Sequence, residues 1–173
     1  MNKKQARVIA KHKRMQITKA DHIIKSKIIT QKIENHHKFI NANIVGIYAP
    51  MQNEVNINFL NLDNKKVVYP RVNKKKALEY VLVDDKTKWE INKFGVKEPK
   101  NGKIINDETI DLLIIPALAR NNNNYRLGYG AGYYDRYLKD NYPLYTIGVI
   151  FDNYTVDFIE DIWDIKLDEF ISN

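Results

Sequence analysis

Two short runs of consecutive apolar residues constrain the fold of this chain most strongly. They are Leu112–Ile115 and Ile147–Ile150. A strand with one solvated face alternates apolar and polar residues, whereas a strand of a parallel sheet covered by helices on both faces is apolar throughout. The two runs therefore predict an α/β protein with a three-layer α/β/α, Rossmann-like fold and a mostly parallel sheet.

Shorter patterns predict the other strands and the first helices. β-Branched or apolar segments predict strands at Ile44–Tyr48, Lys66–Tyr69, Asp111–Ile115 and Tyr145–Phe151, with a less regular one at Tyr80–Val83. A helix is predicted after the candidate N-cap Thr18, because isoleucines recur at roughly helical spacing at Ile24, Ile28, Ile33 and Ile40. A shorter basic helix is expected before it, so the chain begins with helices.

The length of the chain is consistent with one domain spanning residues 1–173. A chain of about 150 residues already buries roughly two-thirds of its unfolded surface, and 173 residues leave no room for a second domain. The segment Lys74–Asn106 is polar and is predicted to be mostly loop, and Asn121–Asn124 is predicted to be a turn. The sequence contains no internal repeat.

The net charge of +7 is concentrated at the N-terminus. Residues 1–40 hold 11 Lys or Arg against 2 acidic residues, whereas residues 41–173 hold 17 against 19. With 11 tyrosines available for stacking, this distribution admits a nucleic-acid-binding module as one hypothesis. The chain has no RNP-like, GXXG or helix-turn-helix pattern, so we expect no nucleic-acid partner. The four histidines match no metal-ligand spacing and are expected at the surface: His12, His22, His36 and His37.

The composition also bears on the compartment. The chain has no cysteine, so neither a disulfide nor a thiolate zinc site can hold the fold, which suits a reducing compartment. No segment has the apolar core of a secretory signal or the ~20 apolar residues that span a bilayer. We therefore expect a soluble cytoplasmic protein without a membrane partner.

A glycine-rich segment carries the strongest functional signal. Gly128, Gly130 and Gly132 lie within Arg126–Arg136, which follows an apolar strand and leads into a predicted helix. Glycines let the main-chain N–H groups approach an anion, and a helix N-terminus adds partial positive charge, so the pattern fits a phosphate cradle. Taken alone, it fits a tight turn equally well. It matches neither a P-loop nor the dinucleotide-binding fingerprint.

With Arg126 before the glycines and Asp135 after them, this segment resembles the RLGxGxGxYDR signature of the 5-formyltetrahydrofolate cyclo-ligase family. Other features typical of the family follow in the right order along nearly the whole chain. They are Lys3-x-x-x-Arg7, Tyr48-Ala49-Pro50 leading to Glu54-Val55, Tyr69-Pro70-Arg71, Phe94-Gly95-Val96-x-Glu98-Pro99 and Asp164-x-x-x-Asp168.

The resemblance implies an ATP-dependent cyclo-ligase that converts 5-formyltetrahydrofolate to 5,10-methenyltetrahydrofolate and releases ADP and phosphate. ATP, the co-substrate, would phosphorylate the formyl oxygen, folate N10 would attack the activated carbon, and phosphate would leave. Such chemistry needs positioning and charge neutralisation rather than a protein nucleophile. Mg²⁺ is the implied cofactor, and both partners are small molecules. The oligomeric state stays open between monomer and dimer.

The resemblance also implies roles for individual residues. The implied catalytic residues are Arg126, Tyr133 and Asp135, and the implied Mg²⁺ ligands are Asp135 and Asp164. The implied ATP-binding residues are Lys3, Arg7, Arg126, Leu127, Gly128, Tyr129, Gly130, Ala131, Gly132, Tyr133 and Tyr134. The implied folate-binding residues are Arg7, Ala49, Met51, Glu54, Phe94, Tyr129 and Tyr133. Without the resemblance, most of these would be solvated charges, turn glycines or core aromatics.

Some positions depart from the family pattern. Arg120 and four asparagines stand before the signature, where the family commonly has Asp or Gly. Ala131 replaces a Gly or Lys, and the sequence ends at Asn173 where many members continue. Two alternatives of function also stay open: an ATP-dependent enzyme with another substrate, and a relative that binds folate without turnover. The second is disfavoured, because the main charged residues of the family pattern are retained.

Overall fold

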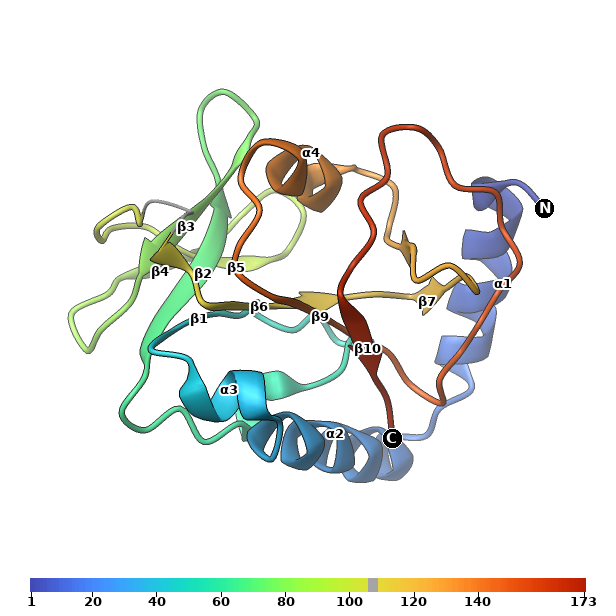
Figure 1. The fold of residues 1–173 in the computed structure, drawn as a ribbon, viewed down its shortest axis with the longest axis horizontal. Coiled ribbons are helices and arrows are strands. Elements are labelled where there is room, and N and C mark those ends of the chain that lie inside the picture. Colours follow the sequence, from blue (N-terminus) through green and yellow to red (C-terminus); the bar gives the residue numbers. More distant parts are fainter. Residues whose placement is uncertain (106–108) are drawn as a thin grey trace.

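The computed structural model describes residues 1–105 and 109–173 (Figure 1). Asn106, the last residue of the segment predicted to be mostly loop, lies outside the described residues. No helix in the described ranges is both long enough and apolar enough to cross a membrane.

A six-stranded sheet forms the centre of the molecule. Its strands, in spatial order, are β10 (Glu169–Ile171), β9 (Thr146–Val149), β6 (Leu112–Pro116), β1 (Ile44–Gly46), β2 (Lys66–Val72) and β3 (Leu78–Leu82). All neighbouring pairs are parallel except β2 with β3. The predicted mostly parallel sheet is therefore confirmed. The edge strand β10, at the end of an acidic stretch, was not predicted.

Helices cover both faces of this sheet. α2 (Lys19–Glu34) and α3 (His37–Asn41) lie on one face, and α4 (Tyr133–Asp140) lies on the other (Figure 1). Alternate residues of β6 pack in the two layers: Leu112 and Ile114 join the core under α2, whereas Leu113 and Ile115 join the core under α4. Because both faces are buried, β6 has to be apolar throughout, and this confirms the three-layer prediction.

The isoleucine pattern predicted α2 but not its buried face. Ile33 is fully buried, whereas Ile24, Ile28 and Ile40 are between 39% and 60% exposed. The residues that α2 buries are Ser26, Ile29, Thr30 and Ile33, and Ile40 lies on the separate helix α3. The packing face of α2 therefore includes two small polar side chains that the apolar pattern did not indicate.

The segment predicted to be mostly loop contains more structure than expected. Besides β3, it holds the antiparallel pair β4 (Trp89–Ile91) and β5 (Lys97–Pro99), which forms a hairpin that lies against β2. A second short pair, β7 (Ala119–Arg120) and β8 (Arg126–Leu127), brackets the predicted asparagine turn. A 3-10 helix, η1 (Ile57–Phe59), follows β1.

The first helix, α1 (Lys3–Met15), lies beyond one end of the sheet, beside β7 and the C-terminal segment (Figure 1). Ala6 and Ala10 pack into a separate core with Leu118, Leu127 and Phe158. The buried Arg14 donates hydrogen bonds to the carbonyl oxygens of Ala117 (2.6 Å) and Leu118 (3.2 Å). α1 is therefore attached to the chain that leaves the carboxyl end of β6.

Candidate active site

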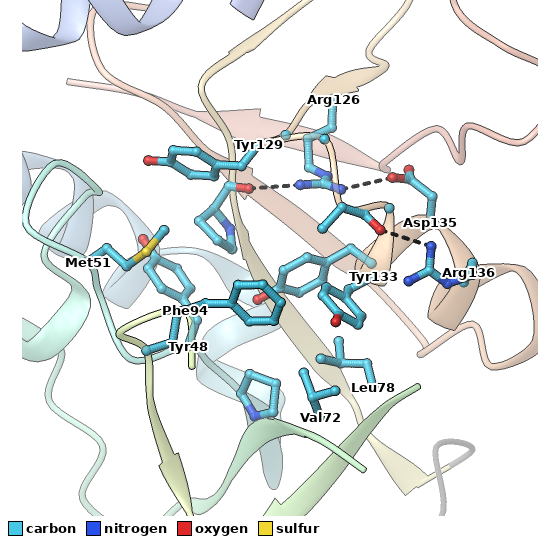
Figure 2. A pocket seen from close by; sticks show the side chains of 18 of the residues that line it. Tyr48, Met51, Val72, Leu78, Phe94, Arg126, Tyr129, Tyr133, Asp135 and Arg136 are labelled. Atoms are coloured by element: carbon cyan, nitrogen blue, oxygen red, sulfur yellow. Dashed lines mark hydrogen bonds and ion pairs between the residues drawn. The ribbon is translucent and has the colours of Figure 1, made fainter. Parts of the chain in front are cut away.

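A cavity of about 850 Å³ lies at the carboxyl edge of the parallel strands. Its walls include Tyr48 after β1, Pro70 of β2 and Pro116 of β6. Because parallel strands end at the same edge, residues distant in sequence meet there, as in other open α/β sheets. The N-terminus of α1, the β4–β5 hairpin, the glycine-rich loop, α4 and the C-terminal segment complete the walls. Figure 2 shows side chains from the hairpin, the loop and α4.

The glycine-rich loop enters the cavity just before α4. Gly130 has φ of 108° and Gly132 has φ of 67°, both in the region that favours glycine. Gly132 is the N-cap of α4, and no described side chain caps this helix. The Arg7 side chain lies over the loop, where its Nε donates to the Gly128 carbonyl oxygen at 2.9 Å. The loop, a helix N-terminus and an arginine thus form a site suited to an anion.

Arg126 is the most buried cation of the cavity, with 8% of its surface exposed. Its Nη2 donates to Asp135 Oδ2 at 3.0 Å and its Nη1 donates to the Pro116 carbonyl oxygen at 3.3 Å (Figure 2). Its guanidinium also lies 5.0 Å from the centre of the Tyr134 ring. The buried Nε has no hydrogen-bond partner among the described residues, so this arginine retains a free donor.

The two predicted Mg²⁺ ligands, Asp135 and Asp164, already have partners within the chain. Asp135 pairs with Arg126, and its Oδ1 also accepts the Ile165 N–H at 3.4 Å, which places it beside Asp164 in the C-terminal segment. Asp164 is paired with Lys3, which also contacts Asp161 at 2.8 Å. Partial burial lowers the pKa of Lys3, but the bonds to the two carboxylates outweigh this, so the net pKa is raised.

The carboxylates present fit one magnesium ion. Across residues 1–105 and 109–173, no group of three or more His, Cys, Asp or Glu side chains could hold a metal ion by itself. Mg²⁺ usually binds to one or two carboxylates and takes its other ligands from phosphate oxygens and water. Asp135 and Asp164, next to an anion site, match that mode.

Glu54 is a buried carboxylate in the cavity wall, with 4% of its surface exposed. Its Oε2 accepts the Met51 N–H at 2.9 Å. Burial raises its pKa from 4.5 to about 6, because this outweighs the effects of the Met51 hydrogen bond and of Arg14 and Arg126. The loop is fixed to α2, since His22 Nε2 lies 2.7 Å from the Glu54 carbonyl oxygen. His22, predicted at the surface, is therefore half-buried and structural; His36 is also half-buried, against Glu169.

Aromatic and apolar side chains surround the space near Glu54. Figure 2 shows Tyr48, Met51 and Phe94 on the side of the cavity opposite Asp135 and Arg136. Phe94, at the tip of the β4–β5 hairpin, is 54% exposed, and its ring lies edge-on to Tyr133 with 6.3 Å between ring centres. A flat, partly polar ring would fit between such walls, with Glu54 accepting its N–H groups.

The structure brings almost all of the predicted site residues together. Every one of them lines the cavity except Leu127, whose side chain is buried in the core against α1. Sequence reasoning missed Arg136, Lys139, Asp161 and Trp163, which also line the cavity. Arg136 closes the predicted signature and could have been included; the other three have no local pattern that distinguishes them from surface residues.

The site lies at the carboxyl edge of a parallel sheet and contains a glycine loop, clustered cations and a buried carboxylate. This arrangement defines the class of α/β enzymes whose ligands bind at that edge of the sheet. The family can be stated more narrowly. The chain belongs to the 5-formyltetrahydrofolate cyclo-ligase family, whose model matches residues 1–173.

Individual relatives agree with this assignment. The chain is 34% identical over 137 residues to the 5-formyltetrahydrofolate cyclo-ligase of Mycoplasma pneumoniae, covering 75% of this chain and 72% of the relative. It is 28% identical over 163 residues to the mouse enzyme of the same name, covering 83% and 80%. A solved 5,10-methenyltetrahydrofolate synthetase from Aquifex aeolicus superposes with a TM-score of 0.86 at 28% identity, covering 99% of this chain and 89% of that one.

Proposed function

We propose that this protein catalyses the ATP- and Mg²⁺-dependent cyclisation of 5-formyltetrahydrofolate to 5,10-methenyltetrahydrofolate, with release of ADP and phosphate. One observation carries the proposal beyond the family assignment. The same cavity joins a glycine loop flanked by Lys3, Arg7 and Arg126 to the aromatic pocket around Glu54. A phosphate donor and a pterin could therefore bind next to each other, as transfer from ATP to the formyl oxygen requires.

The pterin would occupy the pocket near Glu54. In this role the carboxylate accepts two N–H bonds from the 2-amino group and N3 of the ring. Tyr48 is fixed by donating its hydroxyl to the Val55 carbonyl oxygen at 2.7 Å, so it supports the floor of the pocket. Phe94 and Met51 would enclose the ring and exclude water, and Ala49 leaves space for it.

The triphosphate would lie across the glycine loop, held by the cations and by the N-terminus of α4. Arg126, the most buried cation of the cavity, would contact the transferred phosphoryl group and stabilise the charge on it. Asp135 and Asp164 would hold Mg²⁺, which neutralises phosphate charge when bound. Tyr133, between the two regions, would position the formyl group. Folate N10 then attacks the activated carbon, phosphate leaves, and no protein nucleophile is needed.

The alternatives make different predictions for the same cavity. A kinase with another substrate would use the phosphate site but would have no need for the buried Glu54 beside an aromatic pocket. A binder without turnover would bind folate but would need no triphosphate site. The combination of both regions favours the cyclo-ligase reaction.

A direct assay tests the proposal. Purified protein is mixed with 5-formyltetrahydrofolate, ATP and Mg²⁺, and 5,10-methenyltetrahydrofolate is followed by its near-ultraviolet absorbance. We expect product only when all three are present, with ADP formed in equal amount. No product from a folded protein that binds ATP would contradict the proposal, and so would product formation without ATP.

A further inference from the structure

Trp163 is an exposed tryptophan in the wall of the cavity that no role given above requires. Its surface is 64% exposed although its side chain lines the cavity. The segment between β9 and β10, which contains Trp163, passes α1 and then arches toward α4 (Figure 1). The ring therefore presents a large flat apolar surface to whatever occupies this part of the cavity.

Trp163 is held in a defined turn rather than on a loose end. The Asp164 N–H donates to the Asp161 carbonyl oxygen at 3.0 Å, and the Asp161 N–H donates to Asp164 Oδ2 at 2.7 Å. Lys3 binds both carboxylates of this turn. The Lys139 Nζ lies 5.2 Å from the centre of the indole ring. These contacts hold the ring at the cavity wall while most of its surface stays free.

The position of the turn links Trp163 to the phosphate region of the cavity. Trp163 directly precedes Asp164, which pairs with Lys3, and the next N–H, that of Ile165, donates to Asp135. Figure 2 shows Asp135 and Arg136 on the side away from Met51 and Phe94. The turn that carries the tryptophan therefore contacts Lys3 and Asp135, two residues of the proposed triphosphate and Mg²⁺ site.

A nucleotide whose triphosphate crosses the glycine loop must place its base beyond one end of that loop. One end leads to the pterin pocket around Glu54. Beyond the other end α4 begins, and its Asp135 accepts the Ile165 N–H. Two residues before Ile165, Trp163 lines the cavity with a largely exposed ring next to the Lys139 ammonium. Bases stack well on such rings, and tryptophan offers the largest surface. We propose that Trp163 is the platform on which the adenine base of ATP stacks, an inference that rests on the proposed function.

The two tryptophans of the chain allow a direct test. Trp89 lies on the β4–β5 hairpin against Tyr69 and does not line the cavity, so Trp89→Phe leaves Trp163 as the only tryptophan. The probes are Mg²⁺ with a nonhydrolysable ATP analogue and Mg²⁺ with inorganic tripolyphosphate. In Trp89→Phe we expect the analogue to quench the fluorescence emission of Trp163 and tripolyphosphate to leave this emission unchanged. In Trp163→Phe we expect neither probe to change it.

Affinities measured by calorimetry separate a base platform from a general role. We expect Trp163→Ala to lower the affinity for the ATP analogue about tenfold, as loss of one base–aromatic stack does. The affinity for tripolyphosphate should change by less than about twofold. Trp163→Phe, which keeps a smaller ring, should recover most of the lost affinity. Because Trp163 is exposed, both variants should unfold at the temperature of the parent protein.

Other outcomes overturn the inference. If Trp163→Ala lowers the affinity for both probes equally, Trp163 supports the phosphate site rather than the base. If neither affinity changes, Trp163 is not part of the nucleotide site. If only the affinity for 5-formyltetrahydrofolate falls, the Trp163 ring belongs to the folate site. If the parent protein binds tripolyphosphate but the analogue no better, no base is recognised. If the parent protein binds neither, the proposed function itself fails.

Discussion

At the scale of single residues, the charged groups of the site are already paired with one another. Arg126 contacts Asp135, and Lys3 contacts Asp164 and Asp161. In the proposed reaction the cations would turn to phosphate and the carboxylates to Mg²⁺. Such an exchange keeps every buried charge compensated before and after binding, which avoids the cost of leaving one alone.

Glu54 permits a prediction in which stability and binding change in opposite directions. Its raised pKa of about 6, against 4.5, means that the folded protein binds more protons than the unfolded chain between these values. The free energy of unfolding therefore increases as the pH falls through 6 toward 4.5, and above pH 6 the ionised carboxylate is a cost. We expect Glu54→Gln to raise stability at pH 7.5 by about 2 kcal/mol in urea unfolding.

The same substitution should lower the affinity for 5-formyltetrahydrofolate about tenfold. The amide has only one oxygen to accept N–H bonds from the ring, and it carries no charge. In the parent protein, affinity for this folate should fall as the pH drops through about 6, and in Glu54→Gln that pH dependence should disappear. Glu90→Gln, on the exposed side of the hairpin, serves as the control. A pH dependence that survives in Glu54→Gln would assign it to another group.

At the scale of elements, α1 brings one face to the site and leaves the other to solvent. Ala6 and Ala10 are buried, and Arg14 on the same side is anchored to the chain after β6. Lys3 and Arg7 continue this face into the cavity, whereas Lys4 on the other side is exposed. The basic N-terminus thus contains two groups of cations that differ in environment, although composition alone makes them look alike.

This difference predicts that neighbouring lysines of α1 will respond differently to substitution. We expect Lys3→Met to lower the affinity for a nonhydrolysable ATP analogue with Mg²⁺ about tenfold, because a desolvated cation next to the triphosphate is lost. Lys4→Met should change the affinity by less than about twofold, since exposed charges contribute little. Calorimetric titration measures both. Equal effects in the two variants would mean that only the net charge of α1 matters.

At the scale of the whole molecule, the cavity joins segments from both ends of the chain and from its middle. Residue 3, the hairpin near residue 94, the loop at 128–132 and the turn at 161–164 meet at one edge of the sheet. A ligand that fills the cavity therefore contacts segments from both ends and the middle of the chain at once.

We expect binding to stabilise the molecule as a unit. At a concentration of 100 times its Kd, the ATP analogue with Mg²⁺ should increase the free energy of unfolding by about 2.7 kcal/mol. For a chain of this size, that increase raises the Tm by roughly 5 to 10 °C. Calorimetry measures the shift. Hydrogen exchange should slow both in the first turn of α1 and near Asp164; protection limited to the glycine loop would show that the ends of the chain do not take part.

The sequence by itself predicted the architecture, and all but one of its candidate site residues line the cavity. Apolar runs such as Leu112–Ile115 predicted the parallel, doubly covered sheet, because a strand buried on both faces has no place for polar side chains. The family signature indicated the cavity residues from Arg126 to Asp135, with the exception of Leu127. These features are local, and a contiguous stretch of chain can carry them.

Only the tertiary structure decided which distant groups meet. The pairing of Lys3 with Asp164 joins residues 161 positions apart, His22 holds the Glu54 loop, and Trp163 faces the cavity. The structure also placed Leu127 in the core and exposed Ile24 and Ile28. Periodicity in a sequence reports how a segment is buried, whereas the partner of each side chain depends on how whole elements pack against one another.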